Sequence, residues 1–212
     1  MRNCFRASIR RADMNTRISA LLATALVAIA PFAGAANVAG GATVAYVGNA
    51  ADLGNSNGWC CGDLAALSTV TDGATLPVGN QWNINTVFWS GTGDALVITL
   101  PGAASVSSLA LEADNNDTYS VSYLGLDSAW HSLAAMNPDT DSSNGLGDAS
   151  AAFAAVTATA FEITASGDND YAVAEFQANG KFLPAVPEPT SGLLMLAGLG
   201  ALASLARRRS AR

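Results

Sequence analysis

Acidic side chains in polar turns are the residues of this sequence best suited to bind a ligand. The segment that begins at Asp139 places oxygen-bearing side chains at alternating positions, and a hard cation such as Ca²⁺ takes about six to eight oxygen ligands. The segment departs from the standard calcium loop, because Asn144 stands where glycine belongs and Ser150 where glutamate belongs. A solvated acidic turn is the simpler alternative, and calcium is the only candidate cofactor. The candidate ligands are Asp139, Asp141, Asn144 and Asp148.

Two shorter acidic turns lie far apart in the chain, at Asp114–Asp117 and Ser166–Asp170. Each follows a segment with the alternation of a β-strand, so the two turns could meet at one end of a sandwich. Carboxylates about 5 or 6.5–9.5 Å apart in a cleft would hydrolyse a glycosidic bond. A secreted polysaccharide hydrolase is therefore an alternative function. The glutamates that could join such a pair lie on strand-like segments, where we expect them to face solvent: Glu112, Glu162 and Glu175.

Other reactive side chains are few. Cys60 and Cys61 are adjacent, and in an oxidising compartment we expect them to form a disulfide. Pairing with a partner and a redox or metal role are the alternatives. A zinc site needs about four ligands, and His131 is the only histidine. No catalytic residue and no phosphate-binding loop can be identified, so we predict that the protein is not an enzyme. A sugar-stacking surface would draw on four tryptophans, most of which we expect in the core: Trp59, Trp82, Trp89 and Trp130.

Short β-strands must position these residues. Apolar and polar side chains alternate with a period of two in several segments, and turns rich in Gly, Asn and Asp separate them. Ala149–Ala155 could instead form one or two helical turns. Many short strands joined by polar turns predict an all-β fold, a jelly-roll β-sandwich. The expected strands are Ala42–Val47, Thr86–Trp89, Leu96–Leu100, Leu109–Ala113, Tyr119–Tyr123, Phe161–Ala165 and Tyr171–Val173.

The charge of the chain is concentrated in its central part. Between Asn37 and Val186 there are 15 acidic residues and one basic residue, Lys181, which gives a net charge near −14 against −7 for the whole chain. Such a surface repels nucleic acid and anionic lipid, so nucleic acid is excluded as a partner.

The order of these strands resembles the discoidin-like, galactose-binding-like fold. A tryptophan-containing segment, Trp82–Trp89, precedes the apolar Leu96–Leu100, and the turn Asp114–Asp117 leads into a tyrosine strand. The final segment, Tyr171–Phe176, has the pattern aromatic-x-Val-x-Glu. The resemblance covers roughly residues 71–180 and implies a sandwich of a kind that binds sugar, lipid or protein. The distant cysteine pair that ties the ends of some of these domains is absent.

The N-terminus has the features of a secretory signal peptide. Arg17 precedes the apolar run Ile18–Ala30, and small residues follow Pro31. We predict a signal peptide over residues 1–36, with Met14 as the true start. Its cleavage site is formed by Ala33, Ala35 and Ala36. The exported domain then spans residues 37–185.

The C-terminus combines a rigid turn, an apolar run and a basic cluster. The turn contains two prolines, which interrupt regular structure. The run Gly192–Ala206 carries no charge, but at about 1.5 Å per residue it reaches only about 22 Å, less than a hydrocarbon core of about 30 Å. The arginines would hold this end on the cytoplasmic side of a membrane. The turn is Val186, Pro187, Glu188 and Pro189, and the cluster is Arg207, Arg208 and Arg209.

Residues 186–212 resemble the PEP-CTERM sorting signal of bacterial surface and matrix proteins. The resemblance implies that an exosortase recognises the Pro-Glu-Pro motif and cuts nearby. We therefore predict a non-catalytic surface or extracellular-matrix protein with a structural or glycan-binding role. Its expected partners are the Sec translocon, an exosortase, exopolysaccharide or another glycan, and the membrane through the C-terminal helix before processing. A tail-anchored envelope protein is the alternative.

Overall fold

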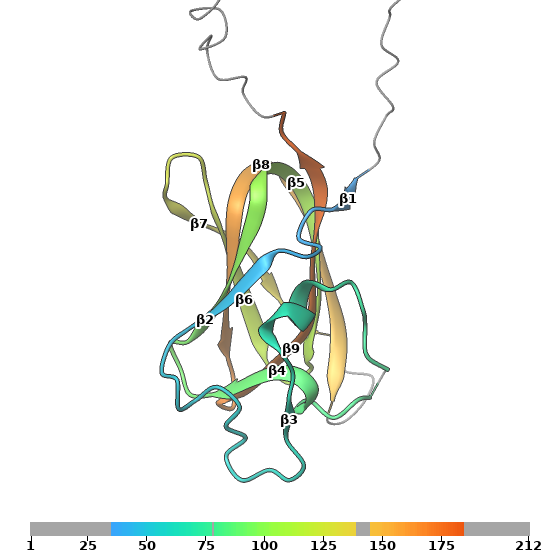
Figure 1. Cartoon of the computed structure of the whole chain (residues 1–212), viewed down its shortest axis with the longest axis vertical. Coiled ribbons are helices and arrows are strands. Elements are labelled where there is room, and N and C mark those ends of the chain that lie inside the picture. Colours follow the sequence, from blue (N-terminus) through green and yellow to red (C-terminus); the bar gives the residue numbers. More distant parts are fainter. Residues whose placement is uncertain (1–34, 78, 139–144, 185–212) are drawn as a thin grey trace, which may run out of the picture. The chain divides into compact units, whose positions relative to one another are not determined.

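The computed structural model describes residues 35–77, 79–138 and 145–184 of the 212-residue chain (Figure 1). The sorting motif, the C-terminal apolar run, most of the signal peptide and the candidate calcium ligands Asp139, Asp141 and Asn144 lie outside these residues. The predictions made for them stay predictions. No helix within the described ranges is long and apolar enough to cross a membrane.

The described residues form nine strands and one short 3₁₀ helix, which confirms the predicted all-β class. The helix, η1, spans Leu67–Thr71. The strands are β1 (Ala36–Asn37), β2 (Thr43–Val47), β3 (Asp63–Leu64), β4 (Ile84–Ser90), β5 (Ala95–Asp114), β6 (Thr118–Leu124), β7 (Trp130–Met136), β8 (Leu146–Ser166) and β9 (Asp170–Phe182).

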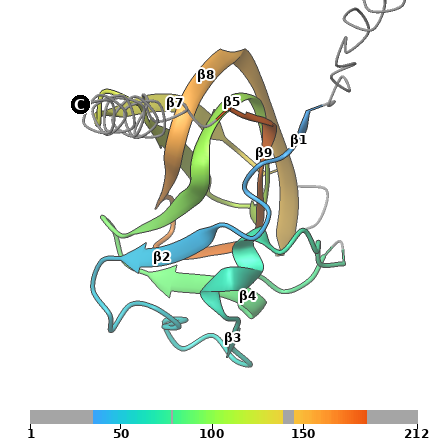
Figure 2. The same ribbon diagram turned by 45° about the horizontal axis from the view of Figure 1, so that its top comes forward.

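Two long strands, β5 and β8, pass from one layer of the fold to the other (Figure 2). In the first layer, the start of β5 pairs with β2 and with the end of β8, which continues to β6 and β7. In the second layer, the end of β5 lies between the start of β8 and β9, and β9 continues to β4 and β1. The register shift between Thr99 and Ala104 marks the bend of β5.

Large side chains from both layers pack against one another between them. Phe161 of the first layer contacts Phe176 of the second, with ring centroids 5.4 Å apart. The hydroxyl of Tyr119 on β6 donates to the carbonyl of Ala172 on β9 at 2.9 Å and accepts from its N–H at 3.2 Å. Because the two layers share one buried core, the predicted β-sandwich is confirmed.

Some strands are longer than the sequence pattern predicted. The two segments predicted around Leu96–Leu100 and Leu109–Ala113 belong to a single 20-residue strand, with the exposed Pro101 at its bend. The helical alternative for Ala149–Ala155 is wrong, because this segment is part of β8. Its alternate residues Ala149, Ala151 and Phe153 pack on the core, as the period of two requires in a half-buried strand.

Candidate functional site

The two short acidic turns meet at one end of the sandwich. Asn116, in the β5–β6 turn, donates its side-chain amide to Asp168 in the β8–β9 turn at 3.0 Å. The backbone N–H of Asp168 in turn donates to the carboxylate of Asp117 at 3.2 Å. These contacts confirm that residues 51 and 52 positions apart in the chain form one acidic cluster. Carboxylates from both turns, Asp114 from the first and Asp168 and Asp170 from the second, line a cavity.

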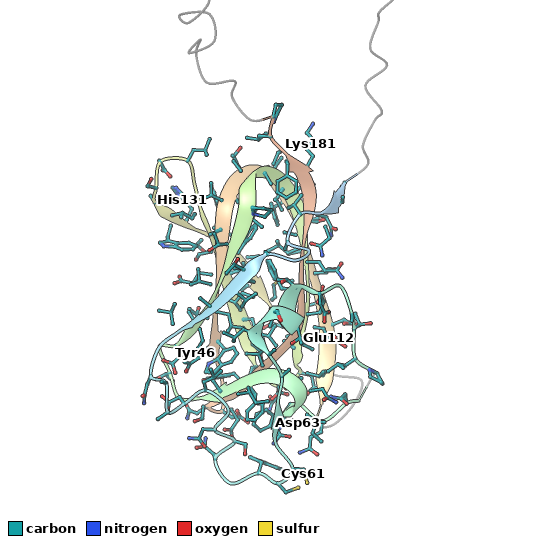
Figure 3. All side chains as sticks on the ribbon, in the orientation of Figure 1. Tyr46, Cys61, Asp63, Glu112, His131 and Lys181 are labelled. Carbon is teal, nitrogen blue, oxygen red and sulfur yellow. The ribbon has the colours of Figure 1, made fainter. Side chains whose placement is uncertain are left out.

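This cavity, the end pocket, has a volume of about 450 Å³. Its lining residue Cys60 adjoins Cys61, which lies at the opposite end of the domain from Lys181 (Figure 3). The volume is within the range of small-molecule sites. The lining residues are Trp59, Cys60, Gly79, Gln81, Trp82, Asp114, Asn116, Asp168 and Asp170.

Trp59 projects from the loop between β2 and β3, and 58% of its surface is exposed. Two residues of this loop, Asn57 and Cys61, have positive φ angles of 48° and 73°. Asn57 donates its amide to the Asp170 carboxylate at 2.7 Å, and the N–H of Trp59 donates to the carbonyl of Ser56 at 2.8 Å. An exposed tryptophan is therefore held beside the acidic cluster by a tied loop.

The opposite wall comes from the segment that leads into β4. Trp82 is buried and packs edge-to-face on Phe88, with ring centroids 5.7 Å apart. Gln81 donates its amide to the carbonyl of Cys60 at 3.3 Å, and Asn83 donates to the same carbonyl at 3.2 Å. The two walls are thus tied together by side-chain amides.

Burial dominates the electrostatics of the acidic cluster. It raises the pKa of Asp114 to about 7, and the nearby Asp117 carboxylate adds to this shift. It raises the pKa of Asp117 to about 7 as well, although the hydrogen bond from Asp168 opposes it. One oxygen of Asp117 is buried and has no hydrogen-bond partner among the described residues. The cluster therefore holds carboxyls whose burial favours the protonated form.

The end pocket combines an exposed aromatic face with acceptors and amides. Tryptophan offers a large apolar surface with specific geometry, and carboxylates and amides bind hydroxyl groups in defined directions. This is the chemistry of a site for a polyhydroxylated ligand. Sequence reasoning identified both acidic turns and Trp59, but it missed Gln81 because nothing in its local pattern distinguishes it from any polar loop residue.

The remaining candidate residues lie elsewhere or only touch this site. Cys60 and Cys61 are both exposed thiols with Sγ atoms 2.8 Å apart, and the disulfide stays a prediction. His131 binds the Asp127 carboxylate at 2.9 Å and stacks on Tyr123. Asp148 lies on β8, and within the described residues no group of three or more His, Cys, Asp or Glu side chains is arranged to hold a metal ion. Calcium therefore stays a prediction.

The tryptophans divide into two groups. Trp82 and Trp89 are buried, as expected for core residues, whereas Trp59 and Trp130 are exposed. Trp130 begins β7 and does not line the end pocket. Of the two exposed tryptophans, Trp59 is therefore the one that lines the end pocket.

The expectation that the strand glutamates face solvent is wrong for two of the three. Glu112 and Glu175 are only 6% and 2% exposed. They point away from the core, but the segment after η1 covers them: the N–H of Leu76 donates to Glu112 at 3.0 Å, and that of Gly73 donates to Glu175 at 3.2 Å. Backbone N–H groups of a covering loop need acceptors, and these carboxylates supply them.

Comparisons with known proteins give one sequence match and several structural ones. Residues 185–210 match the PEP-CTERM protein-sorting motif. No curated protein matches the chain. One similar solved structure is a chitosan-binding module from a chitosanase/glucanase of Paenibacillus sp. IK-5, with 15% identity, a TM-score of 0.42 and coverage of 68% of this chain and 98% of that chain.

Two further similar structures are carbohydrate-binding modules. The family 32 module of Streptococcus pneumoniae EndoD has 10% identity, a TM-score of 0.46 and coverage of 68% of this chain and 98% of that one. CpGH89CBM32-4 of Clostridium perfringens, solved with GlcNAc-α-1,4-galactose, has 17% identity, a TM-score of 0.43 and coverage of 69% and 95%. The chain thus consists of an all-β sandwich followed in the sequence by a PEP-CTERM sorting motif at residues 185–210.

Proposed function

We propose that this chain is an exported, non-catalytic glycan-binding protein that binds polysaccharide in the end pocket. The observation that carries the proposal is the exposed Trp59 beside a 450 Å³ cavity lined by carboxylates and amides. A sugar ring stacked on the indole would present its hydroxyls to Asp168, Asp170 and Gln81. The ligand would be a neutral or positively charged glycan, because the domain carries a net charge near −14.

Delivery follows from the sorting motif. The N-terminal signal directs the chain to the Sec translocon, and the C-terminal apolar run holds it in the inner membrane. An exosortase then cuts near Pro187–Pro189 and releases the domain to the envelope surface or the extracellular matrix. Mass spectrometry of the chain from cells with and without an exosortase tests this step. A fragment ending near Pro189 supports processing, whereas an intact C-terminus in both strains supports a permanent tail anchor.

Binding is tested by retention of the full chain on immobilised polysaccharides, including the exopolysaccharide of the source cells. Trp59→Ala should reduce retention, and Trp130→Ala is the matched control, because Trp130 is also exposed but lies outside the end pocket. Equal retention of both variants would contradict binding at the end pocket. If the chain is retained on none of the polysaccharides, glycan binding is contradicted and only the structural role remains.

A polysaccharide hydrolase is the second candidate, and one observation favours it. Asp114, with its pKa raised to about 7 by burial, lines the same pocket as Asp168, and a general acid needs such a raised pKa. Release of new reducing ends from a polysaccharide that the chain retains, lost in Asp114→Asn, would support hydrolysis. Binding without any product would support the non-catalytic function.

A further inference from the structure

A second cavity lies on the outer face of the β8–β5–β9 layer, away from the end pocket. This face pocket has a volume of about 300 Å³. Its carboxylates stand side by side on three adjacent strands, because Glu112 is directly opposite Asp148 on one side and Glu175 on the other. Residues directly opposite in antiparallel strands share a face. The acidic row Asp148–Glu112–Glu175 therefore crosses three strands and spans about 10 Å.

A second row lies two residues along the same strands. Ala110 is opposite Ser150 on β8 and Gln177 on β9, and all three line the face pocket. The small side chain of Ala110 leaves space between a hydroxyl and an amide. The pocket thus has an acidic side, an apolar floor and a neutral polar side.

One carboxylate oxygen of the acidic row accepts no hydrogen bond from the described residues. Oε1 of Glu175 is buried and has no hydrogen-bond partner within the described part of the chain, and the residue is 2% exposed. Burial raises the pKa of Glu175 to about 7, although hydrogen bonds from the N–H of Gly73 and the side chain of Gln177 oppose the shift, and the Asp72 and Glu112 carboxylates add to it. Lys181 is the only Lys or Arg between residues 35 and 184, and it does not line this pocket. A cationic donor from outside would satisfy both the charge and the open acceptor.

We propose that the face pocket binds the protonated amine of an amino sugar. The ammonium group lies against the acidic row, the ring lies over Ala110, and the ring hydroxyls bind Ser150 and Gln177. A divalent cation is disfavoured by the linear row, because calcium draws its oxygen ligands together at about 2.3–2.6 Å. A lysine side chain would leave the neutral polar row unused. This inference rests on the proposed glycan binding and adds a second site, which binds the ammonium group of the glycan.

The test compares two oligosaccharides with the full chain at pH 7. One is a glucosamine oligomer with free amines, and the other is its N-acetylated counterpart. We expect the free-amine oligomer to bind about tenfold tighter or more, as for a charge-assisted hydrogen bond. Glu175→Gln and Asp148→Asn should abolish this preference, and Glu162→Gln, outside both pockets, should retain it. Asp148 is on the exposed rim, so its variant reports on binding even if Glu175→Gln impairs folding.

The outcomes separate this inference from the proposed function. Trp59→Ala should weaken the binding of both oligomers and leave their ratio unchanged, because it acts at the end pocket. Equal affinity of the wild-type chain for both oligomers would overturn the amine site while leaving the end pocket intact. A preference that survives in both acidic-row variants would overturn it as well. The amine site would also be contradicted if calcium raised the thermal stability of the wild-type chain but not of Glu175→Gln, and if the wild-type chain showed no preference for the free-amine oligomer.

Discussion

The buried carboxyls predict that the domain is more stable in acid than at neutral pH. Asp114, Asp117 and Glu175 have pKa values raised to about 7 by burial, whereas in the unfolded chain they titrate near pH 4. Below about pH 4 both states hold these protons. Between about pH 4 and 7 the folded chain binds more protons than the unfolded chain, so the free energy of unfolding falls as the pH rises.

Asp117 is the residue at which this effect is most cleanly removed. Its pKa is shifted from 3.8 to about 7, which corresponds to at most about 4 kcal/mol, and water at the open end of the sandwich reduces this to about 2 kcal/mol. Asp117→Asn keeps an acceptor for the N–H of Asp168 and places an amide at the unpartnered oxygen. At pH 8 the variant should therefore be about 2 kcal/mol more stable, or about 4–8 °C higher in Tm.

Thermal unfolding of the full chain, followed by circular dichroism from pH 4 to pH 8, measures this effect. The gain in Asp117→Asn should shrink to near zero as the pH falls to 4, because the wild-type carboxyl is then protonated in the folded state and about half protonated in the unfolded state. Asp63→Asn, at an exposed position on β3, is the control and should leave the wild-type profile unchanged. A wild-type Tm that rises from pH 4 to pH 8, or an Asp117→Asn Tm equal to wild type at pH 8, would refute the reasoning.

Three further predictions concern the core and the end pocket. Tyr119→Phe should lower the free energy of unfolding by about 1–3 kcal/mol in denaturant titrations, because it removes both hydrogen bonds to Ala172. Tyr123→Phe, on the half-buried part of the same strand, is the control. An equal loss of stability in the two variants would contradict the role of Tyr119 in joining the two layers. Gly180→Ala should lower Tm strongly, because a Cβ there would overlap the backbone of Ser105. Gly102→Ala is the control and should leave Tm unchanged, because a Cβ there would lie 4.0 Å from the nearest atom, in the Phe182 ring. Equal Tm values for the two variants would show that β9 can move away from Ser105. Trp59→Ala should weaken polysaccharide binding about tenfold in calorimetric titrations, as expected for loss of an aromatic contact, and an unchanged affinity would exclude stacking on this residue.

The strand content of the domain follows from local pattern, but its layering does not. Leu96 and Ile98 are two residues apart on one strand, Phe161 and Ile163 are two apart on another, and all four are in the core as the period of two predicts. The passage of β5 through Pro101 from one layer to the other depends on pairing with β8 and β9, which are far away in the sequence. Local patterns carry no information on such non-local pairing.

The same limit explains which site residues could be predicted. The acidic turns were identifiable because Asp and Asn cluster at strand ends, and both turns reach the same end of the sandwich. The burial of Glu112 and Glu175 was not identifiable, since it depends on the register that sets them opposite each other and on a loop that covers them. Alternation indicates which face a residue occupies, but not what lies over that face.

Hydrogen–deuterium exchange of the full chain, with and without a retained polysaccharide, can show whether glycan binds at the end pocket. We expect slower exchange in three segments that surround the pocket, residues 56–61, 79–83 and 166–170, with little change in β7. Slower exchange confined to β7, or no change in any segment at saturating polysaccharide, would contradict it.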